Sequence, residues 1–200
     1  MNLEEHLGGH ANKTNVDYGA LNWAMSTFNP KTFLDIGCGP GGMVDLANSY
    51  GLESFGIDGD YTVERSNPQH FLIHDFTKGP APLDNTYDIG WSVEFVEHVY
   101  EKYIPNYVQA FQRCKHLILS YAPIGHGGHH HVNENTEEYW INTLESYDFT
   151  YSQELTTELR EVSTMGRSKK QIEKKTTNPL KLKKCFVHLR GLVFVNNKVK

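Results

Sequence analysis

The stretch FLDIGCGPGG, residues 33–42, decides the fold of this 200-residue chain. Its apolar start, preceded by Lys31 and Thr32, favours a buried strand that ends at Gly37. The glycines that follow permit a tight turn and let the backbone approach a ligand closely. The next residues, GGMVDLANSYG (41–51), show the apolar spacing of a helix that Gly51 ends. Strand, glycine-rich turn and helix together predict a βα unit that binds a ligand at the turn.

The composition limits the class of protein to which the chain can belong. Hydrophobic residues make up 38% and charged residues 22%, enough for the core of one domain over residues 1–200. No apolar run is long enough to cross a bilayer, and the polar, acidic start is unlike a signal peptide. We therefore expect a soluble, cytoplasmic protein without a membrane partner. The three widely spaced cysteines predict reduced, buried thiols; they are Cys38, Cys114 and Cys185.

Short apolar runs alternate with helical patterns along the chain. Further strands are predicted at 53–58, 71–75, 87–92 and 116–123, and helices at 18–28, 103–114 and 136–148. Thr136 can cap the last of these helices. Residues 59–70 are too short for a full crossover helix. The alternation predicts an α/β, doubly wound sheet, mostly parallel. Near the end, 148–163 and 185–196 read as two strands of an antiparallel hairpin.

The domain divides into a lead and helix (1–30), a core that carries the glycine turn (31–123) and a terminal part (124–200). Within the terminal part, residues 167–184 hold eight Lys or Arg and one acid. The remainder of the chain has 11 basic and 23 acidic residues, a net charge of −12. This basic segment is either a solvated loop or a contact for a phosphate-bearing partner.

In a parallel sheet the carboxyl ends of the strands line the ligand crevice. This rule places Asp35, Asp58, Asp75 and Ser92 along one rim. Asp58 lies 19 residues after Gly39, where a carboxylate can accept both hydroxyls of a ribose. The turn has no lysine and does not follow the P-loop pattern, and an acid before the glycines suits a cationic group such as an ammonium.

The succession DIGCGPGG, GID, HDF and YDIGWSVEFVEHV resembles class I S-adenosylmethionine-dependent methyltransferases of the type 11/23-like group over residues 31–123. The resemblance implies a Rossmann-like seven-stranded sheet whose last strand is antiparallel. It implies that the loop from Gly37 to Gly39 holds the methionine part of the cofactor and Asp58 the ribose, while Asp75 and Phe76 meet the adenine. The expected cofactor-binding residues are Asp35, Gly37, Gly39, Gly41, Asp58, Gly59, Asp75, Phe76 and Ser92.

After the strand at 87–92 comes SVEFVEHVY, with Glu94, Glu97 and His98 at helical spacing. Spacings of i, i+3 and i, i+4 place all three on one face of a predicted helix. Two carboxylates and an imidazole on one face suit a divalent metal or a general base. The alternative is a histidine that only packs or orients its neighbours.

The loop GHGGHHHVN, residues 125–133, follows the strand at 116–123 and should face Glu94, Glu97 and His98 across the rim. HHHVNENTEEYW (129–140) resembles a segment of small-RNA terminal 2′-O-methyltransferases, and this match falls on His131, Glu134 and Thr136. The resemblance implies that Glu94, Glu97, His98 and His131 bind Mg²⁺ or another divalent cation. The aromatic pair of that family is replaced by asparagines here. The loop's other histidines, His126, His129 and His130, are expected to be loop rather than ligand.

The sequence therefore predicts an S-adenosylmethionine-dependent methyltransferase that acts on an oxygen of a small polar or sugar-like acceptor. Glu94, Glu97, His98 and His131 are the predicted catalytic residues, as a metal cage or a base cluster. The alternatives are an RNA ribose 2′-O-methyltransferase that uses Lys and Arg of 167–184, and a non-catalytic cofactor-binding subunit. Residues 6–23 are either a lid over the cofactor or a frayed terminus. Four aromatic residues either line an acceptor pocket or belong to the core; they are Tyr18, Trp91, Tyr121 and Trp140.

Overall fold

The computed structural model describes residues 3–168 and 184–199. Most of the basic segment 167–184 lies outside these residues, so the hypothesis that it contacts a partner stays a prediction. The helices are α1 (Tyr18–Phe28), α2 (Gly42–Ser49), α3 (Ile104–Phe111), α4 (Glu137–Glu145), α5 (Gln153–Val162) and α7 (Phe186–Arg190). The strands are β1 (Thr32–Ile36), β2 (Glu53–Asp58), β3 (Phe71–Ile73), β4 (Tyr87–Ser92), β5 (Cys114–Leu119), β6 (Phe149–Tyr151) and β7 (Leu192–Asn196).

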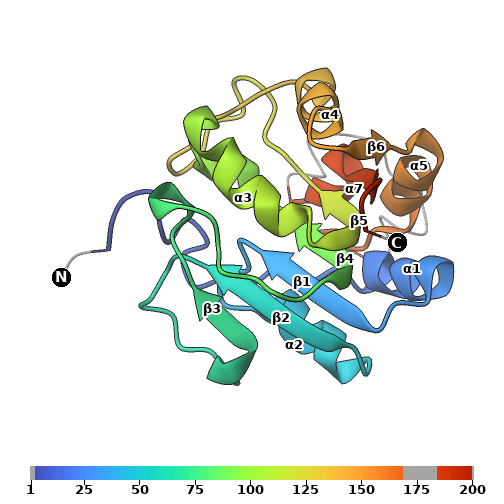
Figure 1. The fold of residues 1–200 in the computed structure, drawn as a ribbon, viewed down its shortest axis with the longest axis horizontal. Coiled ribbons are helices and arrows are strands. Elements are labelled where there is room, and N and C mark those ends of the chain that lie inside the picture. Colours follow the sequence, from blue (N-terminus) through green and yellow to red (C-terminus); the bar gives the residue numbers. More distant parts are fainter. Residues whose placement is uncertain (1–2, 169–183, 200) are drawn as a thin grey trace.

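The strands form one seven-stranded sheet in the order β3-β2-β1-β4-β5-β7-β6, which Figure 1 shows crossing the molecule. The pairs from β3 to β5 are parallel, and β7 runs antiparallel to both β5 and β6. This is the predicted Rossmann-like sheet with an antiparallel last strand. As expected, residues 59–70 hold no crossover helix and contain one 3₁₀ turn, Pro68–His70.

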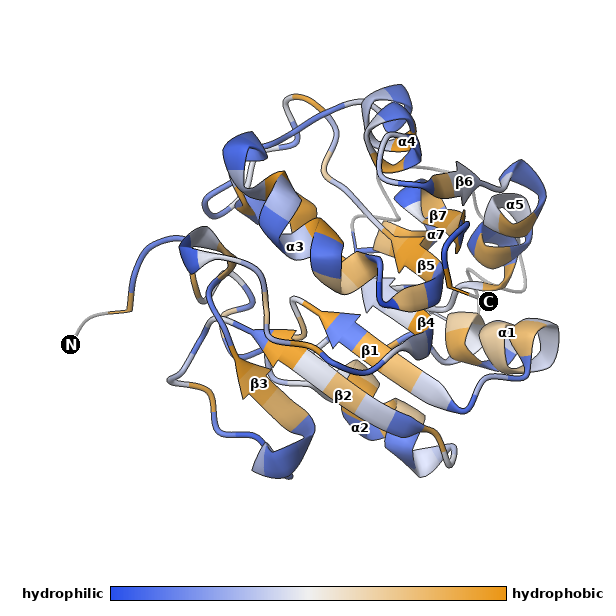
Figure 2. Cartoon of the chain, in the orientation of Figure 1, coloured by the Kyte–Doolittle hydropathy of each residue, from blue (hydrophilic) through white to orange (hydrophobic). Residues whose placement is uncertain are grey.

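Successive residues of the central strands point to opposite faces of the sheet, and each face carries its own core. Leu34, Leu117 and Phe194 pack with residues of α3 and α4. Their neighbours Phe33, Ile118 and Val193 pack with residues of α1, α2 and α5. Figure 2 shows the apolar residues concentrated in the strands, with hydrophilic residues along the connecting loops. All three cysteines are buried and unbridged, as predicted.

Three predictions about local structure are wrong. The segment 185–196 is not one strand, because Phe186–Arg190 form the helix α7 and only Leu192–Asn196 form β7. The segment 148–163 is not one strand, because Ser152 caps a helix by accepting a hydrogen bond from Leu155 N, and α5 follows. The three residues of β6 do pair antiparallel with β7, as the hairpin required.

The ExxEH segment is also not an α-helix. Glu94 has a φ of 57°, which no α-helix contains, and only Val96–His98 form a single 3₁₀ turn. The aromatic and β-branched residues between the two glutamates have low helix propensity, which removes the support that the spacing alone suggested. Over the residues that the structure describes, no helix combines the length and apolar character needed to cross a membrane.

Candidate functional site

A cavity of about 320 Å³ opens at the carboxyl ends of β1, β2 and β4. Ten of the predicted site residues line it, namely Asp35, Gly37, Gly39, Asp58, Gly59, Asp75, Phe76, Glu94, His98 and His131. Gly41 lies at the start of α2 under the ring of Phe71, and Ser92 is buried with its hydroxyl donating to Ile36 O. The structure therefore does not bring these two residues into the cavity.

The glycine loop is fixed by hydrogen bonds to the end of β2. The amides of Gly37 and Cys38 both donate to Ile57 O, at 2.8 and 3.1 Å. Gly37 has a φ of +81°, and a Cβ there would lie 2.4 Å from the ring of Phe95. A glycine is therefore required at position 37 by both the turn and the packing.

Asp58 and Asp35 carry the negative charge of the rim. One oxygen of Asp58 accepts from Gly39 N at 2.7 Å and the other from Asp60 N at 2.8 Å. Asp35 accepts no hydrogen bond from any residue in the described ranges, although it is only 4% exposed. Burial, and then the charge of Asp58, raise the pKa of Asp35 well above its usual value. A cationic ligand group beside Asp35 would relieve this cost.

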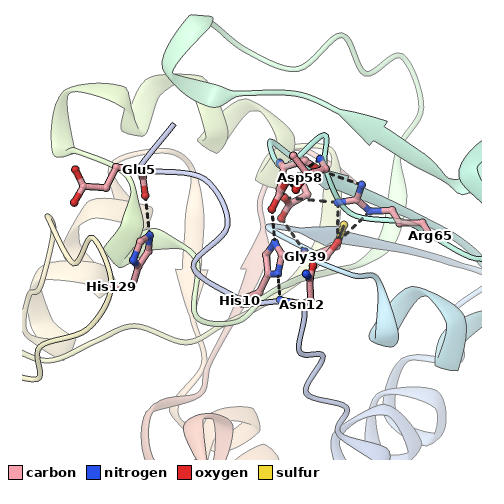
Figure 3. A network of polar contacts seen from close by, with 10 residues as sticks. Glu5, His10, Asn12, Gly39, Asp58, Arg65 and His129 are labelled. Carbon is pink, nitrogen blue, oxygen red and sulfur yellow. Dashed lines mark hydrogen bonds and ion pairs between the residues drawn. The ribbon is translucent and has the colours of Figure 1, made fainter. Parts of the chain in front are cut away.

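Arg65 was not anticipated from the sequence. Its guanidinium donates twice to Gly39 O, at 3.0 and 2.8 Å, and lies 3.7 Å from Asp58 (Figure 3). The side chain thus joins the glycine loop to the end of β2 from a connection that has no regular structure. A lone arginine between strands carries no sequence signal for such a role.

Asp75 and Phe76 lie where the loop after β3 meets the cavity. Thr77 donates its amide and its hydroxyl to Asp75, at 2.8 and 2.9 Å. Burial raises the pKa of Asp75, but these bonds and the nearby His6 outweigh it and lower the pKa overall. Phe76 is buried and packs edge-on against Phe95. A fixed carboxylate and a ring in this position suit a flat base with an amino group.

Glu97, His98 and His131 form the second cluster. One ligand atom from each lies within 4.8 Å of the others. Glu97 is fully buried, and neither of its carboxylate oxygens has a hydrogen-bond partner among residues 3–168 and 184–199. Burial, and then the nearby Glu94, raise the pKa of Glu97 well above its usual value. Burial also lowers the pKa of His98 to about 4, helped by the adjacent His131, so this imidazole is neutral at physiological pH.

Glu134 organises the loop that carries His131. Its carboxylate accepts from Gly125 N and Gly127 N, at 2.7 and 2.6 Å, and lies 2.9 Å from Nδ1 of His131. A proton on Nδ1 donated to Glu134 leaves Nε2 of His131 free to bind a ligand. The predicted cap is also present, since Tyr139 N donates to the hydroxyl of Thr136.

The backbone ties the two parts of this cluster together, because Val132 N and Asn133 N both donate to the carbonyl oxygen of Glu97. The loop after β5 is thereby held against the turn after β4, even though that turn is not the predicted helix.

Glu94, His98 and His131 line the cavity, whereas the fully buried Glu97 does not. Glu94 is not within the group of three potential ligand residues. Its Oε1 lies 3.2 Å from the hydroxyl of Ser120 and 3.3 Å from the guanidinium of Arg190. Burial raises the pKa of Glu94 to about 7, even though Arg190 opposes the shift. Arg190 belongs to α7, nearly a hundred residues further along the chain, and no local pattern in the sequence predicts this contact.

The other predicted residues divide between surface and core. His126 lies beside Arg190, His129 beside the N-terminal segment and His130 beside Tyr100, so none joins the group of three. Of the four aromatic candidates, Trp91 lines the cavity, whereas Tyr18 is exposed and Tyr121 and Trp140 are buried in the core. Residues 6–10 and 13–15 of the lead form part of the cavity wall.

Residues 34–118 match the family model described as a methyltransferase domain. A protein from Oryza sativa subsp. japonica, described as a probable chloroplastic tocopherol O-methyltransferase, is 35% identical over 85 residues. The match covers 36% of this chain and 23% of the rice protein, so the chain spans about a quarter of this curated relative.

Three solved structures share the fold. The plantazolicin methyltransferase BpumL in complex with SAH has a TM-score of 0.53 at 14% identity and covers 90% of this chain and 81% of its own. Magnesium protoporphyrin IX methyltransferase from Synechocystis PCC 6803 with bound SAH has a TM-score of 0.52 at 18% identity, covering 67% and 70%. The methyltransferase domain of bacterial CtHen1-C has a TM-score of 0.53 at 19% identity, covering 67% and 84%.

At such identities the structural likeness shows the fold alone. Residues 34–118, somewhat less than half of the chain, are similar to the family described as a methyltransferase domain.

Proposed function

We propose that the protein transfers the methyl group of S-adenosylmethionine to an oxygen of a small polar or sugar-like acceptor, assisted by a divalent cation. The observation that carries the metal-assisted part is the carboxylate of Glu97, which is fully buried and has no hydrogen-bond partner in the described part of the chain. A buried carboxylate without a partner is costly, and a bound cation offsets that cost.

Several residues that line the cavity support binding of S-adenosylmethionine. Asp35 offers the ammonium group a carboxylate that no described residue engages. Asp58 would hold the ribose hydroxyls, and Asp75 and Phe76 the amino group and face of the adenine. When bound, the cofactor supplies an electrophilic methyl group, so the protein's task is to align the acceptor and to accept its proton.

Glu97, His98 and His131 would hold the cation. One carboxylate and two imidazoles are ligands that several divalent metals accept. The contact between Glu134 and His131 repeats a common arrangement in which a carboxylate orients a metal-binding histidine. A cation held here would lower the pKa of an acceptor hydroxyl bound to it.

Glu94 would accept the proton of the acceptor hydroxyl. Its Oε1 is engaged by Ser120 and Arg190, which leaves Oε2 for the substrate. With a pKa of about 7, the carboxylate is partly ionised at neutral pH and so is matched to general-base work. The description of the rice relative as an O-methyltransferase supports oxygen as the accepting atom.

The small acceptor is favoured over RNA because the chain outside the basic segment 167–184 carries a net charge of −12, which repels a polyanion. The RNA alternative depends on the lysines of that segment. Neutralising Lys169, Lys170, Lys174 and Lys175 would abolish salt-sensitive RNA binding if the segment provides it. RNA binding that ignored these changes would exclude the alternative.

The metal is tested by titrating chelator-treated protein with Mn²⁺ and Mg²⁺ in a calorimeter. The wild type should bind one ion, and Glu97→Gln should bind it at least tenfold more weakly because it loses a charged ligand. His126→Ala is the matched control, since this histidine lies in the same loop outside the group of three. Equal ion binding by the wild type and Glu97→Gln would exclude this site, as would methyl transfer that is unchanged in excess chelator.

A further inference from the structure

The lead segment, residues 3–15, forms a strap across the cavity before α1 begins. It contains no helix or strand and is built of successive turns, closed by hydrogen bonds from Leu7 N to Glu4 O, Ala11 N to Gly8 O and Lys13 N to His10 O. Figure 3 shows this strap passing between the loop that holds His129 and the ends of β1 and β2. It contacts both the residues proposed to bind the cofactor and the histidine-rich loop, residues 125–133.

On the cofactor side, two histidines of the strap lie against carboxylates. Nε2 of His6 lies 3.1 Å from Asp75, and Nε2 of His10 lies 3.1 Å from Asp60. Asn12 N donates to Nδ1 of His10 at 3.0 Å, whereas the buried Nε2 makes no hydrogen bond to any residue that the structure describes. The same ring covers Gly39, where an added Cβ would lie 3.1 Å from it.

On the acceptor side, the strap contacts the histidine-rich loop. Nε2 of His129 donates to the carbonyl oxygen of Glu5 at 2.8 Å (Figure 3). Gly9 packs against the ring of His98, so closely that a Cβ on Gly9 would lie 3.2 Å from Cε1 of His98. The backbone of the strap therefore forms one wall around a predicted metal ligand.

We propose that binding of the cofactor closes this strap. We further propose that His129 is the positioning residue that joins the closed strap to the histidine-rich loop, residues 125–133. The proposal rests on the cofactor site of the proposed function. A few polar contacts at the protein surface do not offset the entropy lost when a dozen residues are ordered. A cofactor lying beneath the strap adds the missing contact area, so closure follows occupancy of the cavity.

The coupling must act in both directions. Loss of the bond between His129 and Glu5 loosens the strap, and the cofactor then binds more weakly although His129 lies on the acceptor loop. Conversely, a bound cofactor holds Gly9 of the strap against His98, and this contact shapes the site proposed for the acceptor before the acceptor binds.

The test measures S-adenosylhomocysteine binding by calorimetry for the wild type and three variants of the full chain. His129→Ala should bind roughly three- to tenfold more weakly, as expected for loss of one hydrogen bond. His129→Gln should recover most of the affinity, because its amide can donate to the same carbonyl. His126→Ala, in the same loop but away from the strap, should bind like the wild type.

Limited proteolysis reports on closure itself, because Lys13 is exposed within the strap. S-adenosylhomocysteine should slow tryptic cleavage after Lys13 severalfold in the wild type and much less in His129→Ala, as read by intact mass. Equal protection in both proteins, or unchanged affinity in His129→Ala, would overturn the proposal. Folded wild type that binds no S-adenosylhomocysteine would instead overturn the proposed function on which the strap depends.

Discussion

Replacing Gly37 by alanine tests how tightly the glycine loop is packed against the cavity wall. Gly37 has a φ of +81°, and its Cβ would lie 2.4, 2.5 and 2.6 Å from three atoms of the Phe95 side chain. That ring is itself packed edge-on against Phe76 and Tyr107, so it has little room to move. The substitution therefore combines backbone strain with a collision in the cavity wall.

The two costs can be sized separately. An L-residue in the left-handed region costs about 1–2 kcal/mol, and overpacking a filled site adds about 1–3 kcal/mol. The free energy of unfolding should thus fall by about 2–5 kcal/mol. For a domain of this size, each kcal/mol lowers Tm by roughly 2–4 °C.

Gly51 provides the matched control. It has nearly the same φ, +85°, but nothing lies within 4 Å of the Cβ that it would gain. Gly51→Ala should therefore show only the backbone cost, about 1–2 kcal/mol. The difference between the two variants isolates the collision with Phe95.

Urea unfolding followed by circular dichroism measures both variants, and calorimetry with S-adenosylhomocysteine reports the effect on binding. Gly37→Ala should be less stable than Gly51→Ala and should bind more weakly, whereas Gly51→Ala should bind like the wild type. If the two variants were destabilised equally, Phe95 would be free to move aside and the packing argument would be refuted.

Three further predictions concern buried carboxylates. Asp35→Asn should weaken S-adenosylhomocysteine binding by about tenfold or more, which calorimetry measures. The same substitution should stabilise the ligand-free protein at neutral pH, because burial raises the pKa of Asp35, and thermal unfolding measures this gain. Because the pKa of Glu97 is raised in the folded state, the protonated side chain favours folding. This contribution to the free energy of unfolding is complete below the unfolded pKa near 4.5 and is lost as pH rises through the folded pKa. The metal-free wild type should therefore lose Tm more steeply than Glu97→Gln as pH rises above 4.5, and parallel curves would contradict this. Asp17→Ala should cost roughly 3 kcal/mol in urea unfolding, since the buried carboxylate accepts from Ala20 N, the hydroxyl of Ser163 and Thr164 N; a loss below 1 kcal/mol would show that water replaces these bonds.

Sequence reasoning succeeded where a local pattern decides the structure. The bounds predicted for α1, β2 and β4 agree with the structure to the residue, because apolar spacing and turn residues both mark them. The same holds for residues at strand ends, since the topology of a parallel sheet brings them to one rim. Asp35, Asp58 and Asp75 therefore line the cavity as expected.

Where the structure departs from prediction, the causes are not local. Spacing suggested a helix through Glu94 and Glu97, yet Glu94 adopts a left-handed conformation and its carboxylate faces Arg190 from the far end of the chain. In α5, the apolar residues Leu155, Leu159 and Val162 have helical spacing behind a serine cap, so a signal for that helix was present but weak. Contacts between residues far apart in sequence, such as Arg65 with the glycine loop, leave no pattern in a single sequence.

The two edges of the sheet have a consequence for solubility. Both edge strands, β3 and β6, contain three residues, so each offers few unpaired backbone groups to another chain. The six-residue β5, which reads CKHLIL, is shielded because the chain's last strand inserts between it and β6. Loss of β7 would turn that apolar strand into an open edge. The terminal strand therefore protects the fold against aggregation as well as completing it.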